Sequence, residues 1–137
     1  SRLLFKENYR LVCRRDHPEL QQSPDLAQFC QLEHVIVSPD GGGFVGSTDE
    51  ALAALGLTRK VVMSVPHFSF VSAVLSRTNM VALLPERLVR DDPALKILDA
   101  PIEITGFDKV MLWPERVHRD PAHQWLRELI ARAVAAE

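Results

Sequence analysis

The chain has 137 residues, of which 47% are hydrophobic and 25% are charged, and its formal net charge of −2 corresponds to a pI of about 6.2. This composition is typical of a globular protein with its own core, and it excludes a strongly basic nucleic-acid surface within these residues. No apolar run approaches the roughly 20 residues that cross a bilayer and no secretory signal opens the chain, so we expect a soluble, cytoplasmic protein with no membrane partner.

Strand and helix patterns alternate along the first half of the chain. Residues 9–13 predict a strand, and Ser23 followed by Pro24 predicts a helix whose N-cap is Ser23. The β-branched run at 34–38 is typical of a buried strand, and a glycine-rich loop at 39–46 follows it.

The next helix has recognisable start and stop signals. Ser47 and Glu50 have the spacing of a capping box, and Gly56 suits a left-handed helix end. Residues 59–65 predict another strand, after which Pro66 opens a further helix.

The second half continues the alternation, with extended segments predicted at 80–84, 95–98 and 109–113, and helices at 85–89 and after Asp120-Pro121. This order predicts βαβ units and a mostly parallel sheet covered on both faces. Two extended crossings, Leu3–Asn8 and Leu98–Thr105, bracket the central block as hinge strands between two lobes would. Trp113 and Trp125 are expected in the core.

Several familiar chemistries are excluded by missing residues. The spacing from Gly41 to Gly46 fits a phosphate loop, but Ser47 occupies the position of the required lysine. No Gly-x-Ser-x-Gly, Cys-x-x-Cys or His-Glu-x-x-His motif occurs, so we expect no catalytic residue, no metal and no cofactor. Cys13 and Cys30 lie in apolar runs and are expected to be reduced, buried thiols.

His67 is the most informative single residue. It follows Pro66 at a helix start directly after a strand, and open α/β sheets bind ligands beyond the carboxyl ends of their strands. An imidazole N–H there, with free backbone N–H groups, suits a carboxylate, whereas the alternative is a half-exposed capping histidine. The glycine loop is likewise either a ligand contact or a surface turn.

The order of several short motifs resembles the effector-binding domain of LysR-type transcription regulators, in particular the branch with the nodulation regulators and the regulators that sense salicylate and nitroaromatic acids. The motifs cover nearly the whole chain and are Leu11–Pro18, Ser38-Pro39, Asp49–Leu52, Val65-Pro66-His67-Phe68, Val81–Leu88, Trp113 and Arg119–Leu126.

The resemblance implies an α/β, type 2 periplasmic-binding-protein-like fold with two lobes joined by two crossing strands. On that map residues 1–8 are a hinge strand, 9–98 the second regulatory lobe, and 99–137 the return hinge with the C-terminal part of the first lobe. The first lobe is expected to be incomplete, and the DNA-binding helix-turn-helix is expected in an N-terminal part outside these residues.

The resemblance also implies where a ligand binds. The predicted ligand-binding residues are Ser38, Gly43, Phe44, Pro66, His67, Phe68 and Leu112. The family branch often has a histidine in the glycine loop and Trp-His near position 113; this chain has Phe44 and Trp113-Pro114 instead, which argues against salicylate itself as the ligand.

We therefore expect a ligand-sensing, non-enzymatic domain of a homo-oligomeric transcription regulator, which binds a small organic acid, aromatic acids included, between its lobes. An α/β enzyme fragment, such as a transferase or hydrolase, is the alternative, but it lacks a convergent set of acid, base and nucleophile. A solute-binding protein of the same fold is the third reading.

Overall fold

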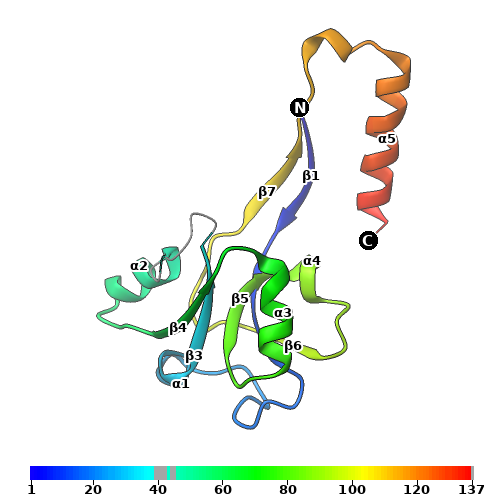
Figure 1. The fold of residues 1–137 in the computed structure, drawn as a ribbon. Coiled ribbons are helices and arrows are strands. Elements are labelled where there is room, and N and C mark those ends of the chain that lie inside the picture. Colours follow the sequence, from blue (N-terminus) through cyan, green and yellow to red (C-terminus); the bar gives the residue numbers. More distant parts are fainter. Residues whose placement is uncertain (39–42, 44–45, 137) are drawn as a thin grey trace. The chain divides into compact units, whose positions relative to one another are not determined.

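The computed structural model describes residues 1–38, 43 and 46–136, which form two compact units (Figure 1). Unit 1 comprises Ser1–Asn8 and Gly106–Glu137, and unit 2 comprises Tyr9–Thr105. Each unit has its own sheet. The interpretation of the two chain crossings as hinges between lobes stays a prediction.

Unit 2 is built on a five-stranded sheet of order β4-β3-β5-β2-β6. Its strands are β2 (Tyr9–Arg14), β3 (Glu33–Val37), β4 (Lys60–Val65), β5 (Val81–Pro85) and β6 (Leu95–Leu98). Strand β3 runs parallel to β4 and β5, whereas β2 is antiparallel to β5 and β6. Four of the five strands therefore run in the same direction, as a mostly parallel sheet requires, and β2 alone is reversed. The reversal of β2 makes two of the four pairings antiparallel, which local periodicity does not record.

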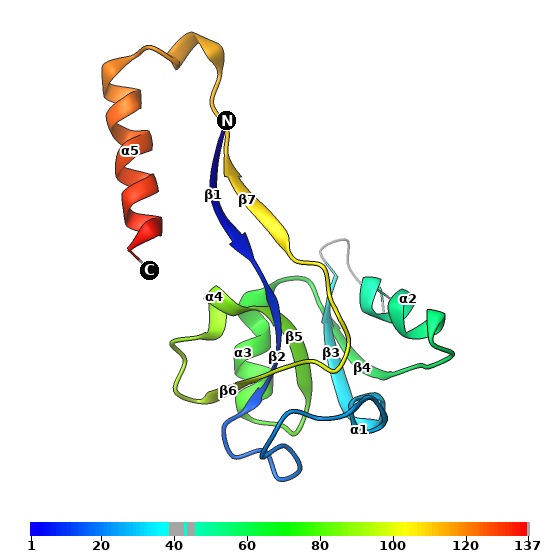
Figure 2. The same ribbon diagram turned by 180° about the vertical axis from the view of Figure 1, so that it is seen from behind.

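Helices cover both faces of this sheet (Figure 2). Helix α3 (Phe68–Ser76) and the short α4 (Glu86–Val89) pack on one face, and α1 (Leu26–Gln31) and α2 (Ser47–Ala54) on the other. The alternation of side chains along β2 separates the two cores, because Val12 points to the α3 side while Leu11 and Cys13 point to the α1 side.

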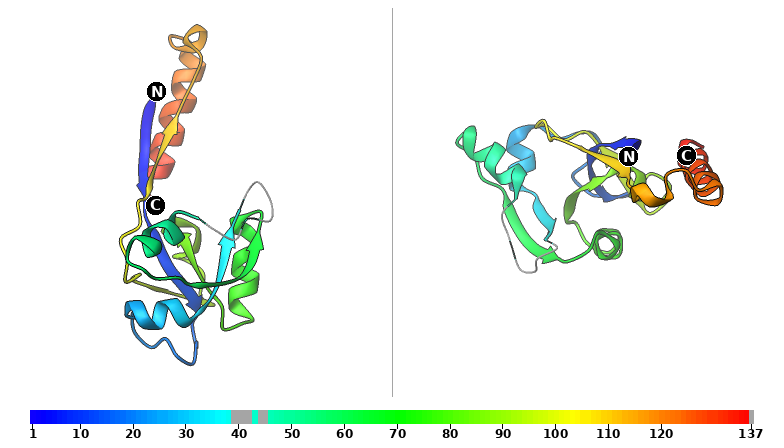
Figure 3. Two further views of the ribbon diagram at one scale, coloured as in Figure 1. Left: turned by 90° about the vertical axis from the view of Figure 1, so that its left-hand side faces the viewer. Right: turned by 90° about the horizontal axis from the view of Figure 1, so that it is seen from above.

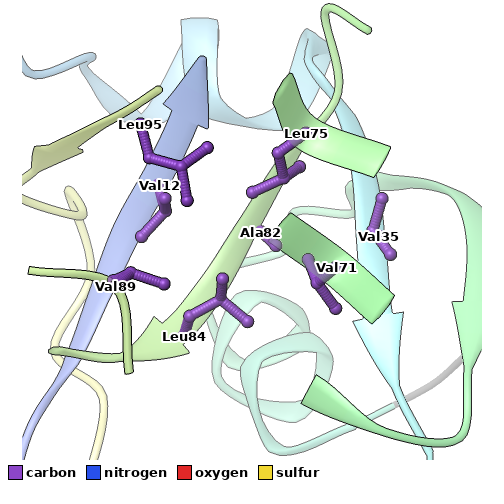
Figure 4. Close-up of a cluster of buried hydrophobic side chains, with 8 residues drawn as sticks. All are labelled: Val12, Val35, Val71, Leu75, Ala82, Leu84, Val89 and Leu95. Carbon is purple, nitrogen blue, oxygen red and sulfur yellow. The ribbon is translucent and has the colours of Figure 1, made fainter. Parts of the chain in front are cut away.

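The core on the α3 side joins helix and sheet through aliphatic side chains (Figure 4). Val71 and Leu75, one helical turn apart on α3, meet Ala82 and Leu84 from β5 and Val35 from β3. All five are essentially inaccessible to solvent. This packing holds the beginning of α3 firmly against the carboxyl ends of the parallel strands.

The helix starts differ in detail from the sequence expectations. The N-cap of α1 is Asp25, whose Oδ1 accepts from the backbone N–H of Gln28 at 2.8 Å. Ser23 is not the cap; its Oγ accepts from the N–H of Asp99 at 3.0 Å. The carboxylate of Asp25 offers the helix start a charged acceptor, which makes it the stronger cap.

Helix α2 is also capped one residue away from the predicted position. Its N-cap is Gly46, whose N–H donates to Oδ2 of Asp49 at 2.8 Å, so Asp49 rather than Glu50 supplies the carboxylate. Gly56 has a φ of +72° just beyond the helix end, as its sequence position indicated.

Unit 1 consists of a two-stranded antiparallel ribbon and one long helix (Figure 3). Strands β1 (Arg2–Glu7) and β7 (Phe107–Met111) form the ribbon, and a 3-10 turn, η1 (Glu115–Val117), leads to α5 (Pro121–Ala135). The strand predicted at 109–113 lies two residues earlier, and residues 99–105 of the predicted second crossing contain no strand.

Three predictions of buried side chains need correction. Trp125 is 61% exposed on α5, and Trp113 and Cys30 are only partly buried, whereas Cys13 is fully buried. The face of α5 that looks apolar in the sequence includes Trp125, Leu126 and Leu129, all of which are exposed, while Arg127 is buried in their place.

Candidate functional site

Unit 2 contains a cleft of about 170 Å³ at the carboxyl-terminal side of its parallel strands. The last half of β3, the first turn of α2 and the first residue of α3 border it, with contributions from β2, β5 and two loops. Its lining residues are Tyr9, Val35, Ile36, Val37, Gly46, Ser47, Thr48, Arg59, Phe68, Leu83 and Ile104. Ligands of α/β proteins commonly bind in this position.

Apolar side chains make up much of the wall. Val37, Leu83 and Ile104 line the cleft, and Phe68 lines it while also packing against the core beneath α3. A wall that is anchored in the core keeps its shape without a ligand, which lowers the entropic cost of binding.

The polar side of the cleft is the first turn of α2 together with Arg59. The hydroxyl groups of Ser47 and Thr48 and the phenol of Tyr9 belong to residues that border the space. The first N–H groups of a helix have no partner within the helix and attract negative charge. This side of the cleft therefore suits an anionic or strongly polar group.

Arg59, which lines the cleft, forms a buried ion pair with Asp49. Its Nε donates to Oδ1 of Asp49 at 2.9 Å and its Nη2 donates to Oδ2 at 3.0 Å, a bidentate arrangement. The side chains are only 4% and 18% exposed, respectively. Burial alone would raise the pKa of Asp49, but the hydrogen bonds from Arg59 and from the N–H of Gly46 outweigh burial and hold that pKa below its usual value.

The structure brings some of the predicted site residues together. Phe68 lines the cleft, and Ser38 directly follows the lining residue Val37. Gly43 lies against Ser38, because a Cβ at Gly43 would be 3.0 Å from the Ser38 Oγ. The backbone N–H of Ser38 donates to the carbonyl of Val65 at 2.8 Å, which ties this segment to the end of β4.

The other predicted residues are not among those that line the cleft. His67 is the N-cap of α3 and is exposed, with its ring centroid 6.0 Å from that of Phe70, and Pro66 beside it is also exposed. Leu112 belongs to unit 1 and is 74% exposed. Phe44 lies outside the described residues.

Sequence reasoning missed Tyr9, Arg59 and Ile104 as lining residues. Arg59 was assigned to a strand, and its partner Asp49 to a family motif within a helix. A basic residue ten positions after an acidic one has no distinctive local pattern.

A second cleft, of about 350 Å³, lies within unit 1 and is lined by Arg2, Trp113, Gln124, Arg127 and Glu128. Its charged groups are engaged with each other: Arg2 Nη1 contacts Glu128 Oε1 at 2.9 Å, and the Arg127 guanidinium lies 4.3 Å from the Trp113 ring centroid. Because these charged groups already have partners within unit 1, we interpret this cleft as a result of the packing of α5 and not as a ligand site.

Residues 1–38, 43 and 46–136 show neither a metal site nor a membrane-spanning helix. Within these ranges no cluster of three or more His, Cys, Asp or Glu side chains is arranged to hold a metal ion. None of the helices there has the length and apolar character to span a bilayer.

Residues 1–135 match the LysR substrate binding domain family. The chain is 33% identical to the HTH-type transcriptional activator NahR of Pseudomonas putida over 95% of this chain and 44% of NahR. It is 31% identical to the HTH-type transcriptional regulator SyrM of Rhizobium meliloti (strain 1021), over 98% of this chain and 42% of SyrM. The chain thus spans less than half the length of these curated relatives.

Solved structures show the same fold. The regulatory domain of MexT, a transcriptional activator in Pseudomonas aeruginosa, is 28% identical with a TM-score of 0.75, over 95% of this chain and 65% of that domain. The effector binding domain of QuiR in complex with shikimate is 16% identical with a TM-score of 0.63, over 98% and 65% of the two chains, a likeness of fold alone. The prediction of an α/β, type 2 periplasmic-binding-protein-like fold is confirmed.

Proposed function

Because this chain belongs to the LysR substrate binding domain family, we propose that it senses a small organic acid, which binds in the cleft of unit 2 and alters transcription by the whole protein. The observation that carries this proposal is the cleft itself, with core-anchored apolar walls on one side and the first turn of α2 with Arg59 on the other. The curated relatives are transcription regulators and not enzymes, as predicted.

The apolar wall of the cleft supports the proposal that the organic acid is aromatic. Phe68 offers a ring that is held by the core beneath α3, and flat aromatic ligands bind well against such surfaces. Val37 and Leu83 add aliphatic contact. A carboxylate at the α2 side would lie at the positive end of this helix.

His67, Pro66, Phe44 and Leu112 stay proposed ligand-binding residues on the strength of the family resemblance. His67 is exposed at the N-cap of α3 and does not line the cleft. The proposal for His67 therefore requires a ligand that extends out of the cleft as far as the imidazole. Ser38 and Gly43 lie together beside the end of β3 and are proposed to contact the ligand through their backbone.

Isothermal titration calorimetry of the intact protein with benzoate, salicylate and shikimate tests the ligand proposal. We expect Phe68→Ala to weaken binding about tenfold or more, because it removes a buried aromatic contact. The matched control is Leu88→Ala, which changes a side chain that is 61% exposed. Equal affinity of wild type and His67→Ala would remove His67 from the site, and failure of wild type to bind any organic acid would overturn the proposal.

We also propose that DNA is bound by a part of the whole protein outside these residues. The names of the curated relatives include a helix-turn-helix, and the net charge of −2 here is unsuited to a phosphate backbone. Such a regulator works in the cytoplasm, where bacterial DNA lies. Ligand binding would then shift DNA affinity by a coupling free energy of about 1–3 kcal/mol, measurable as a change in operator binding by fluorescence anisotropy.

A homo-oligomer is the final element of the proposal. The family resemblance supports it, as operator sites are commonly read by symmetric dimers. Sedimentation velocity of the intact protein over a range of concentrations tests it, and a monomer at all concentrations would refute it.

A further inference from the structure

The ion pair between Asp49 and Arg59 differs from the other ion pairs of the described residues. In each of the others both side chains are at least 26% exposed, whereas these two are 18% and 4% exposed. Exposed pairs contribute little, but a buried charge without its partner is costly. A pair of this kind in the wall of a cleft is therefore a strong electrostatic feature of the site.

The hydrogen bonds divide the two partners into different roles. The Asp49 carboxylate accepts from Nε and Nη2 of Arg59 and from the N–H of Gly46, at 2.8–3.0 Å. A guanidinium has five N–H donors, and Arg59 uses two of them on Asp49, its partner among the described residues. Three of the five donors are thus not used on Asp49, and Arg59 borders the cleft whereas Asp49 does not.

Resting on the proposed function, we propose that Arg59 binds the carboxylate of the ligand and that Asp49 sets the strength of this recognition. Asp49 is a positioning residue: it orients the guanidinium by two parallel hydrogen bonds, and its negative charge offsets part of the attraction for an anionic ligand. The cleft thus selects an organic carboxylate over its neutral amide, with moderate rather than maximal affinity.

This assignment makes the two halves of one ion pair respond in opposite directions. Asp49→Asn removes the opposing charge and keeps one oxygen as acceptor for the Gly46 N–H and for Nη2 of Arg59, while the Arg59 Nε–H loses its acceptor. The removal of the negative charge dominates at the cleft, so carboxylate affinity increases about threefold or more. Arg59→Gln removes the ligand's charged partner and leaves the Asp49 carboxylate near the cleft, so carboxylate affinity falls about 10- to 100-fold. The affinity for the neutral amide changes little in either variant.

A pair that merely joins the start of β4 to the start of α2 behaves differently. Both variants would then loosen the same contact, and both would weaken the acid and the amide to a similar extent. The sign of the change for Asp49→Asn, and the ratio of acid to amide affinity, separate the two roles even if both variants lose some stability.

The experiment uses the intact protein and two matched probes, benzoate with benzamide and salicylate with salicylamide, measured by titration calorimetry. The variants are Asp49→Asn, Arg59→Gln and Arg59→Lys, with circular dichroism spectra to verify folding. Glu33→Gln and Lys60→Gln are the matched controls, because they make the same changes of net charge at an exposed ion pair whose Nζ and Oε1 atoms are 3.5 Å apart.

The expected result is tighter acid binding by Asp49→Asn, weaker binding by Arg59→Gln, partial rescue by Arg59→Lys, and wild-type affinities for both controls. Loss of affinity in both Asp49→Asn and Arg59→Gln, for acid and amide alike, overturns the inference and leaves the proposed function intact. Wild type binding neither acid overturns the proposed function and this inference with it.

Discussion

His34, the second residue of β3, has no solvent exposure. Its Nε2 lies 2.7 Å from the carbonyl oxygen of Phe29, so Nε2–H donates and the ring is neutral at Nδ1. Nδ1 is buried without a partner among the described residues, and the Phe29 ring packs edge-on at 4.6 Å between centroids. Burial lowers the pKa of His34 to about 4, with the nearby Arg59 charge acting in the same direction.

This lowered pKa predicts a loss of stability in mild acid. The unfolded chain binds a proton at His34 near pH 6.5 while the folded chain resists it, so stability is complete above pH 6.5 and declines as the pH falls toward 4, by up to about 3 kcal/mol. Urea unfolding between pH 7 and 4.5 measures this. His34→Gln is expected to be less stable at pH 7 but to depend less steeply on pH; parallel pH profiles of the two proteins would contradict the assignment.

Gly106 shows a different constraint at the residue scale. A Cβ at this position would be 1.9 Å from the carbonyl oxygen of Glu7, a backbone atom that cannot rotate away. Gly106→Ala is expected to destabilise the β1–β7 ribbon by about 1–3 kcal/mol through overpacking. The expected result is faster exchange of the amide hydrogens of β1 and β7, measured by native-state hydrogen exchange.

The matched control is Gly56→Ala. At Gly56 a Cβ meets nothing within 4 Å, so the substitution costs only the left-handed backbone conformation, about 1 kcal/mol. If both alanine variants left exchange in β1 and β7 unchanged, the close approach of Gly106 to Glu7 would be refuted.

At the scale of elements, α5 depends on a buried arginine for its attachment to the preceding segment. Arg127 is 7% exposed; it donates to the carbonyls of Val117 and His118 at 3.3 and 2.8 Å, and its guanidinium lies over the Trp113 ring. The Trp113 Nε1 in turn donates to Nδ1 of His118 at 3.0 Å. Arg127 thus binds the turn between β7 and α5 together with Gln124 Nε2, which donates to the His118 carbonyl, and the Asp120 N–H, which donates to the Val117 carbonyl, each at 3.2 Å.

Removing this side chain is expected to release the turn. Arg127→Met preserves volume but removes one donor from each of the Val117 and His118 carbonyls, which keep the Asp120 N–H and the Gln124 Nε2 as donors, so the expected cost is about 1–2 kcal/mol. The expected readouts are a red-shifted Trp113 emission, as cation–π contact is lost and water enters, and faster exchange at residues 115–123. Arg132→Met, which changes an exposed arginine on the same helix, serves as control; equal effects of the two variants would refute the role of Arg127.

At the scale of the whole molecule, the two units differ in how much they bury. Among the described residues of unit 1, Glu7, Arg127 and Ala131 are buried, whereas unit 2 has two aliphatic cores. A two-stranded ribbon with little apolar burial is marginally stable. Native-state hydrogen exchange is therefore expected to show faster opening of β1, β7 and α5 than of β2, β3 and β5, with equal protection in both units contradicting the division.

Helix α5 of unit 1 also carries exposed apolar side chains, such as Trp125 and Leu129, which add to the difference in burial between the two units. The helix is amphipathic in sequence, and periodicity identified the apolar face correctly. It could not identify whether that face is buried, because burial depends on what packs against the helix. In unit 1 the described residues cover Arg127 and Ala131 instead.

The sequence alone determined what local physics decides: the order of strands and helices, the left-handed end at Gly56, and the motif order that identified the family. These depend on side-chain period, caps and backbone conformation within a few residues. Only the tertiary structure decided the antiparallel placement of β2, the cleft beside Phe68, and the pairing of Asp49 with Arg59. Those features arise from contacts between segments distant in sequence, and the free energy of burying and pairing such groups exists only once the chain has folded.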